Sequence, residues 1–118
     1  MSEFRFKGLD IWKKSIEVDD HLFEIADRVE KRKYYRYEEQ LRAASMSISN
    51  NIAEGSGSFS NKDFANFLVI ARKSVFECAN LLFLFLRKNI ITEEEKQNEY
   101  DELQALSKMI TNFRRKLL

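Results

Sequence analysis

The chain contains no proline and only three glycines among its 118 residues. Proline ends helices and serves in turns, and glycine serves in tight turns, so a β-rich chain of this length would need more of both. The sequence therefore favours long helices joined by few connections. With 44% hydrophobic and 33% charged residues, it has the balance of a globular protein. We expect one domain, residues 1–118, whose core needs no disulfide or metal.

Apolar residues recur at helical spacing in four segments. The first covers about residues 9–30 and the second about residues 35–54, while the third and fourth begin after Ser60 and Thr92. Short connections make successive helices antiparallel neighbours. The predicted fold is all-α, an antiparallel up-down-up-down four-helix bundle.

Local signals mark the helix ends. Thr92 with Glu95 forms a capping-box pattern, and Ser60 is a good N-cap. Phe59 is expected to staple onto Phe64 across that cap. Gly55 is expected to end the second helix in the left-handed conformation.

Residues 81–86 read LLFLFL, so apolar side chains go right around the third helix. One bundle core covers only one stripe of a helix. We expect neighbouring chain or another subunit to cover the surplus, which predicts a stable oligomer.

The N-terminus lacks the apolar segment of a signal peptide, and the longest apolar run, residues 78–86, is far shorter than the roughly 20 residues of a membrane span. The single cysteine, Cys78, cannot form an internal disulfide, which suits a reducing compartment. We therefore expect a cytoplasmic protein with no membrane partner.

No residue pattern indicates catalysis or a cofactor. His21 is the only histidine, and no second His or Cys lies at ligand spacing, so we expect no metal and interpret it as a surface or boundary residue. The Ser56-Gly57-Ser58 loop lacks the Gly-Lys-Ser/Thr ending of a phosphate-binding loop and follows no strand. We expect no catalytic residue, no cofactor and no enzyme.

Although the net charge is only +1, bases gather at both ends of the expected bundle. Residues 31–37 interleave bases with tyrosines, which is typical of single-strand binding but also of a solvated turn whose rings pack on the bundle. The end that carries the chain's start has fewer acids, and we favour it. The candidate nucleic-acid-binding residues are Arg5, Lys13, Lys14, Lys31, Arg32, Lys33, Arg36, Arg114, Arg115 and Lys116.

A stripe of short or polar residues follows one face of the second helix: Gln40, Ala44, Ser47, Asn51 and Glu54. Small residues let another helix approach closely, so we interpret the stripe as a helix-packing or subunit-packing surface, with ligand binding as the alternative. Asn51 and Glu54 are then expected to be at least partly buried and hydrogen-bonded.

Residues 40–55, which read QLRAASMSISNNIAEG, resemble the signature of the bacterial four-helix bundle family known as S23 ribosomal protein, encoded in intervening sequences of ribosomal RNA genes. Residues 6–14 (FKGLDIWKK), 64–71 (FANFLVIA) and 74–77 (SVFE) resemble other parts of that family. The family-motif residues expected to serve packing are Gln40, Arg42, Ser47, Asn51, Glu54 and Gly55.

The resemblance implies a ring-like homopentamer. It also implies a relation to the accessory variability determinant of diversity-generating retroelements, which binds nucleic acid and a reverse transcriptase. The chain departs from the family pattern at Ala43 and Ser58, where arginines are common, at Lys73, where glycine is usual, and by lacking a proline before the second helix. The two missing bases weaken the implication of nucleic-acid binding.

The leading hypothesis is a non-enzymatic homo-oligomeric binding module that associates with RNA, DNA or a nucleic-acid enzyme such as a reverse transcriptase. The alternative is a protein-interaction scaffold without nucleic-acid contact. Salt-dependent binding to nucleic acid would separate them.

Overall fold

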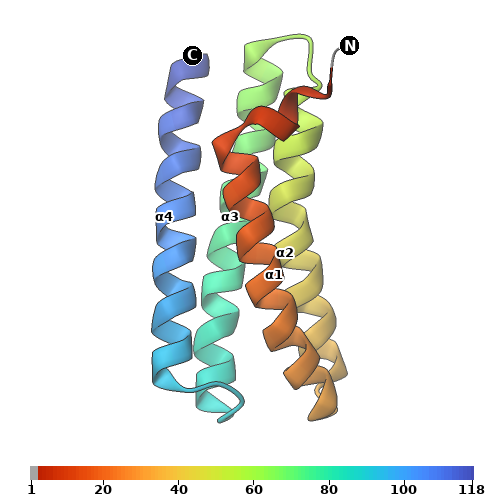
Figure 1. Cartoon of the computed structure of the whole chain (residues 1–118), viewed down its shortest axis with the longest axis vertical. Helices are drawn as coiled ribbons and strands as arrows, with labels where there is room; N and C mark the ends of the chain where they lie inside the picture. Colours follow the sequence, from red (N-terminus) through yellow and green to blue (C-terminus); the bar gives the residue numbers. More distant parts are fainter. Residues whose placement is uncertain (1–2) are drawn as a thin grey trace.

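The computed structural model describes residues 3–118, so the first two residues of the expected domain lie outside it. The described chain forms a short 3-10 helix, η1 (Arg5–Gly8), and four α-helices: α1 (Asp10–Lys31), α2 (Tyr35–Ser56), α3 (Asn61–Arg87) and α4 (Glu93–Leu117). The helices run alternately up and down in a bundle 44 Å long (Figure 1). The predicted all-α four-helix bundle is confirmed, and each helix begins within one residue of its predicted start.

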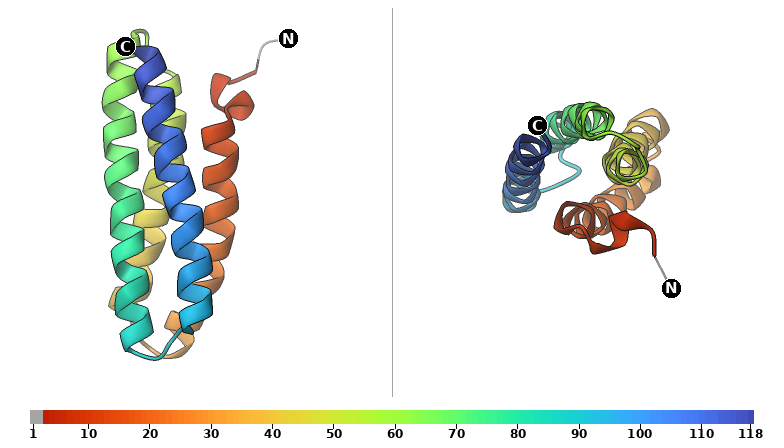
Figure 2. Two further views of the ribbon diagram at one scale, coloured as in Figure 1. Left: turned by 90° about the vertical axis from the view of Figure 1, so that its left-hand side faces the viewer. Right: turned by 90° about the horizontal axis from the view of Figure 1, so that it is seen from above.

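Both chain ends lie at one end of the bundle, here called the terminal end, together with the α2–α3 loop (Figure 1). The α1–α2 and α3–α4 connections lie at the opposite end, the hairpin end. Seen end-on, successive helices are neighbours, and η1 caps the terminal end beside α1 and α2 (Figure 2). The α1 and α4 helices make the least contact of the neighbouring pairs.

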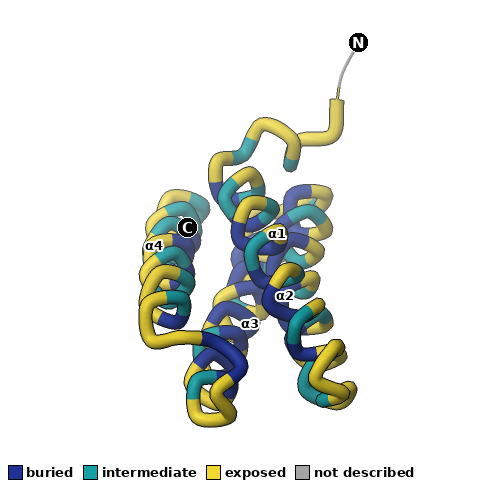
Figure 3. The backbone as a smooth tube through the Cα atoms, turned by 60° about the horizontal axis from the view of Figure 1, so that its bottom comes forward, coloured by how far each residue is buried: buried dark blue, intermediate teal, exposed yellow. Residues whose placement is uncertain are grey.

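The four apolar stripes meet in one core, and the buried side of each helix faces the bundle axis (Figure 3). The fully buried large side chains come from every helix and include Leu22, Ile48, Phe64, Phe85 and Leu106. Local signals also act as expected at two helix starts. Ser60 accepts a hydrogen bond from the Asp63 amide, and Thr92 and Glu95 form the reciprocal capping box.

A close seam joins α2 to α3, and the small-residue stripe of α2 lies along it. Ser74 on α3 donates a hydrogen bond to Ser47 on α2, with 2.8 Å between the oxygens. Asn51 is half-buried and donates to both the Ser47 carbonyl and its hydroxyl, at 2.7 and 3.0 Å. The part of the stripe around Ser47 and Asn51 therefore packs against a helix of the same chain, while Gln40 and Glu54 are exposed.

Gly55 allows the closest approach at this seam, and this overturns the expectation that it ends the helix. The α2 helix continues to Ser56, and no glycine in the described chain has a positive φ. A Cβ built on Gly55 would lie 2.7 Å from Cβ of Phe67 and 2.8 Å from Cδ1 of Phe64. Gly55 is needed for the space it leaves, because any side chain would push α3 away.

Two further expectations about side chains are wrong for the single chain. Glu54 is exposed and no described side chain bonds to it, because it points away from the seam that holds Asn51. Phe59 is fully exposed, so it does not staple onto Phe64. The apolar run 81–86 is covered in part by the chain itself, one of the two alternatives expected for it, and Phe83 and Leu84 remain exposed.

Two polar groups tie α1 to α2. Asp19 is buried and accepts hydrogen bonds from the hydroxyls of Ser45 and Ser49, and burial raises the pKa of its carboxyl group. Arg42 lies between acids of both helices, 2.8 Å from Asp27 and 2.7 Å from Glu38. These carboxylates raise the pKa of the Arg42 guanidinium further, so its charge is already neutralised within the chain.

Candidate nucleic-acid interface

The basic side chains predicted to bind at the terminal end differ in their exposure and in their ion pairing. Lys13, Arg115 and Lys116 are exposed, with no described acid within ion-pair distance. Lys14 is half-buried and paired with Glu102 on α4 as well as with Glu17, and the bond to Glu102 raises the pKa of its ammonium group. Lys14 therefore holds α1 against α4 and offers little charge to a partner.

Arg5 and Arg114 are partly engaged by the fold. The Arg5 guanidinium lies 5.0 Å from the centre of the Phe64 ring, and Nε of Arg114 donates to the Ala65 carbonyl at 3.1 Å. Neither makes an ion pair with a described acid, so both charges remain uncompensated at short range. The Arg114 bond also fixes where its guanidinium stands beside α3.

At the hairpin end, the basic-aromatic turn makes a shallow depression of about 390 Å³ lined by residues 33–37. Lys31, Arg32, Lys33 and Arg36 are all exposed. Arg32 lies 5.9 Å from the centre of the Tyr34 ring and donates weakly to the Asn89 carbonyl. The turn therefore combines bases and rings as predicted, although the rings of Tyr34 and Tyr37 stack on each other and partly on the core.

The structure adds bases that the sequence interpretation did not select. Arg72 and Lys73 on α3 lie beside Lys108, Arg114 and Arg115 on α4, where two depressions follow the groove between these helices. The one nearer the terminal end has a volume of about 380 Å³, the other about 310 Å³, and Arg72 lines both. The scarcity of acids in residues 61–76 was the available sequence signal, since Asp63 is the only one there.

We call these side chains the basic α3/α4 face, defined as Arg72, Lys73, Lys108, Arg114 and Arg115. Among residues 3–118, none of them lies within 4.0 Å of a carboxylate oxygen, while five other bases do: Lys7, Lys14, Arg28, Arg42 and Lys96. The remaining family-motif residue, Gln40, is exposed on α2 and belongs to neither basic surface. The face thus concentrates unpaired positive charge on one side of a nearly neutral molecule.

Nothing in the described residues forms a cluster of three metal-ligating side chains. Nδ1 of His21 lies 3.2 Å from Oε1 of Glu99 without hydrogen-bond geometry, in a small depression between α1 and α4. Burial raises the pKa of Glu99, against the effect of His21. Cys78 is buried in the core, which raises the pKa of its thiol and makes it a poor nucleophile.

No helix in the described chain has both the length and the apolar character to cross a membrane.

Comparison with known proteins agrees with the fold. The family model described as 23S rRNA-intervening sequence protein matches residues 7–112. A crystal structure of a protein of unknown function from the S23 ribosomal protein family, from Bacteroides thetaiotaomicron VPI-5482, superposes with a TM-score of 0.83. The two sequences are 26% identical, and the match covers 88% of this chain and 97% of the other. Among curated proteins, none matches this sequence significantly.

Proposed function

The chain belongs to the 23S rRNA-intervening sequence protein family, and we propose that it is a non-enzymatic, homo-oligomeric module that binds nucleic acid through its basic α3/α4 face. The observation that carries the proposal is the set of five basic side chains on that face, none of which is paired with a described acid. Burying or pairing these charges against phosphate releases counterions, which favours binding.

The shape of the face suits contact with the phosphate backbone of a nucleic acid. From Lys108 to Arg115 the α4 helix rises roughly 11 Å, at about 1.5 Å per residue. Arg72 and Lys73 lie across the groove from these residues on α3. Successive phosphates of one strand can therefore contact several lysine and arginine side chains along the groove. None of the helices described in residues 3–118 stands apart from the bundle to enter a DNA groove, so we expect weak sequence selectivity.

The direct test is a titration of labelled RNA and DNA with the purified protein at several salt concentrations. The triple variant Arg114→Glu, Arg115→Glu, Lys116→Glu should lower affinity at least tenfold at low salt, because it replaces three attractive charges by repulsive ones. A matched control carries the same reversal at the hairpin end: Lys31→Glu, Arg32→Glu, Lys33→Glu. Circular dichroism establishes that both variants keep the helical fold.

The outcomes are distinct. If the wild-type protein binds neither RNA nor DNA at low salt, the nucleic-acid proposal is refuted. If the terminal-end variant binds normally and the hairpin-end variant does not, the interface lies at the residue 31–37 turn instead. Loss of binding in the first variant alone supports the basic α3/α4 face.

A protein-interaction scaffold is the second candidate, and exposed apolar side chains on the helices favour it. Met46, Ile70, Phe76 and Leu84 are each between 39% and 56% exposed. Such side chains suit contact with further subunits or with another protein. Light scattering at micromolar concentration should give the mass of an oligomer, and a monomer mass would refute the homo-oligomeric part of the proposal.

A further inference from the structure

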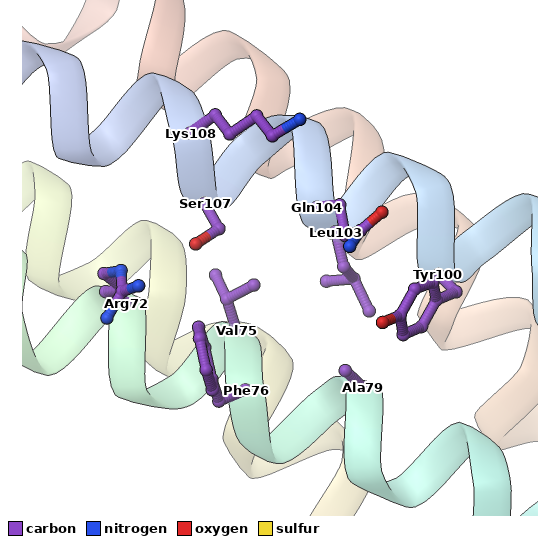
Figure 4. A pocket seen from close by; sticks show the side chains of 9 residues that line it. All are labelled: Arg72, Val75, Phe76, Ala79, Tyr100, Leu103, Gln104, Ser107 and Lys108. Atoms are coloured by element: carbon purple, nitrogen blue, oxygen red, sulfur yellow. The ribbon is translucent and has the colours of Figure 1, made fainter.

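The depression of about 310 Å³ between α3 and α4 has an apolar base and aromatic sides. Val75 and Leu103 are buried beneath it, and Ala79 lies between them and the surface. Figure 4 shows the α3 side chains Val75 and Phe76 facing the α4 side chains Leu103 and Tyr100 across this space. The volume is at the lower end of the roughly 300–1,000 Å³ of ligand pockets, which suits one small ring system.

Phe76 is the exposed aromatic side chain of this depression on α3, and 56% of it is accessible. Arg72, one turn earlier, places its guanidinium 4.7 Å from the centre of the Phe76 ring. In Figure 4 the ring stands between Arg72 on one side and Ala79 and Tyr100 on the other. One face of the ring is thus supported by a cation, while the other is directed into the groove.

Basic side chains line the groove from this depression towards the terminal end. Arg72 and Lys108 line the depression itself, and Lys73, Arg114 and Arg115 line the next one along the same groove. Neither lining contains an acid. An apolar, aromatic depression that continues into a line of unpaired bases is complementary to a ligand that carries flat rings on an anionic chain.

We propose that this groove binds single-stranded nucleic acid, with one unpaired base stacked on Phe76 and the adjoining phosphates held by Arg72, Lys73, Lys108 and Arg115. A base in a duplex is already stacked on both faces and cannot enter the depression, whereas an unpaired base exposes its faces. A duplex could contact only the lysine and arginine side chains of the face, through its phosphates. The inference rests on the proposed nucleic-acid function and adds the form of nucleic acid and the residue that selects it.

The experiment compares fluorescence anisotropy of a labelled 20-nucleotide single strand, as RNA and as DNA, with that of the corresponding duplex. The wild-type protein should bind the single strand more tightly. Phe76→Ala should weaken single-strand binding about 5- to 150-fold, the range for loss of one stacked base, and leave duplex binding unchanged. Phe76→Trp should retain the preference because it keeps an aromatic face.

Two further variants control for other effects. Phe59→Ala removes another exposed aromatic side chain, which lies on the α2–α3 connection outside the depression, and should leave both affinities unchanged. The double variant Lys73→Glu, Lys108→Glu should weaken single-strand and duplex binding alike, because it acts on phosphate contacts.

The results separate this inference from the proposal beneath it. Equal binding of single strand and duplex, with Phe76→Ala unchanged, overturns the stacking inference and leaves the nucleic-acid function standing. Absence of binding to either form overturns both. If an acidic amphipathic peptide binds with dependence on Phe76 and the single strand does not, the groove is a protein-docking site and the inference is wrong.

Discussion

Replacing Gly55 by alanine tests whether the α2–α3 seam depends on contact rather than on backbone conformation. Gly55 lies inside α2 with a negative φ, so an alanine fits the backbone and by itself adds up to about 1 kcal/mol of helix propensity. Its methyl group, however, would lie 2.7 Å from Cβ of Phe67 and 2.8 Å from Cδ1 of Phe64. The two effects have opposite signs, and the structure decides which is larger.

Relief of these contacts is restricted. Cβ of Phe67 is attached directly to the α3 backbone and cannot rotate away, and Phe64 is only 1% exposed within the core. The helices must therefore separate, and overpacking of this kind costs roughly 1–3 kcal/mol. Subtracting a propensity gain of about 1 kcal/mol leaves a net loss of up to about 2 kcal/mol. For a chain of this size we expect the melting temperature to fall, by up to roughly 12 °C.

Thermal melting followed by circular dichroism measures the effect, and Gly57→Ala is the matched control. A Cβ on Gly57 would meet only the Glu54 carbonyl, at an ordinary 3.4 Å, and the φ of Gly57 is −86°. Its melting temperature should stay the same or rise slightly. If Gly55→Ala melts at or above the wild-type temperature, the seam tolerates a methyl group and the packing argument fails.

Two further substitutions have effects whose signs follow from the structure. Asp19→Asn should raise the melting temperature at pH 7, because burial raises the pKa of the Asp19 carboxyl group above its ordinary value of 3.8 in the folded chain. Folding then takes up a proton at pH values just above 3.8, so the stability of the wild type relative to the variant should fall as the pH rises from about 4. A difference in melting temperature that stays constant across several pH values would contradict this. Lys33→Gly should stabilise the fold by about 0.5–1 kcal/mol, because Lys33 has a φ of 65°, which a residue with a Cβ adopts at a cost in free energy. An unchanged or lower midpoint of urea unfolding would contradict the assignment of strain to Lys33.

The helices, their starting residues and most of the core could be predicted from the sequence alone. Periodicity and caps act over a few residues, so the hydroxyl of Ser60 or Thr92 and the spacing of Leu103, Leu106 and Ile110 predict local structure without knowledge of neighbours. The absence of acids from the C-terminal part of the last helix was visible in the same way, since residues 108–118 hold four bases and no acid.

Relations between helices depended on tertiary structure. The sequence placed Gly55 beside a helix end, where glycine commonly takes a left-handed conformation, but how near α3 approaches depends on how the two helices pack. In the same way, Glu54 and Asn51 share a stripe, yet only Asn51 faces the seam, because the stripe is wider than the contact.

The candidate site shows the same division. Each base on α3 and α4 is visible in the sequence, but which of them stand together depends on the register in which the two helices pack. That register brings Arg72 and Phe76 opposite Lys108 and Tyr100, while it pairs Lys14 with Glu102 and so removes a predicted binding residue. Short-range chemistry determined the helices of this protein, and long-range packing decided which of their outward side chains form a surface.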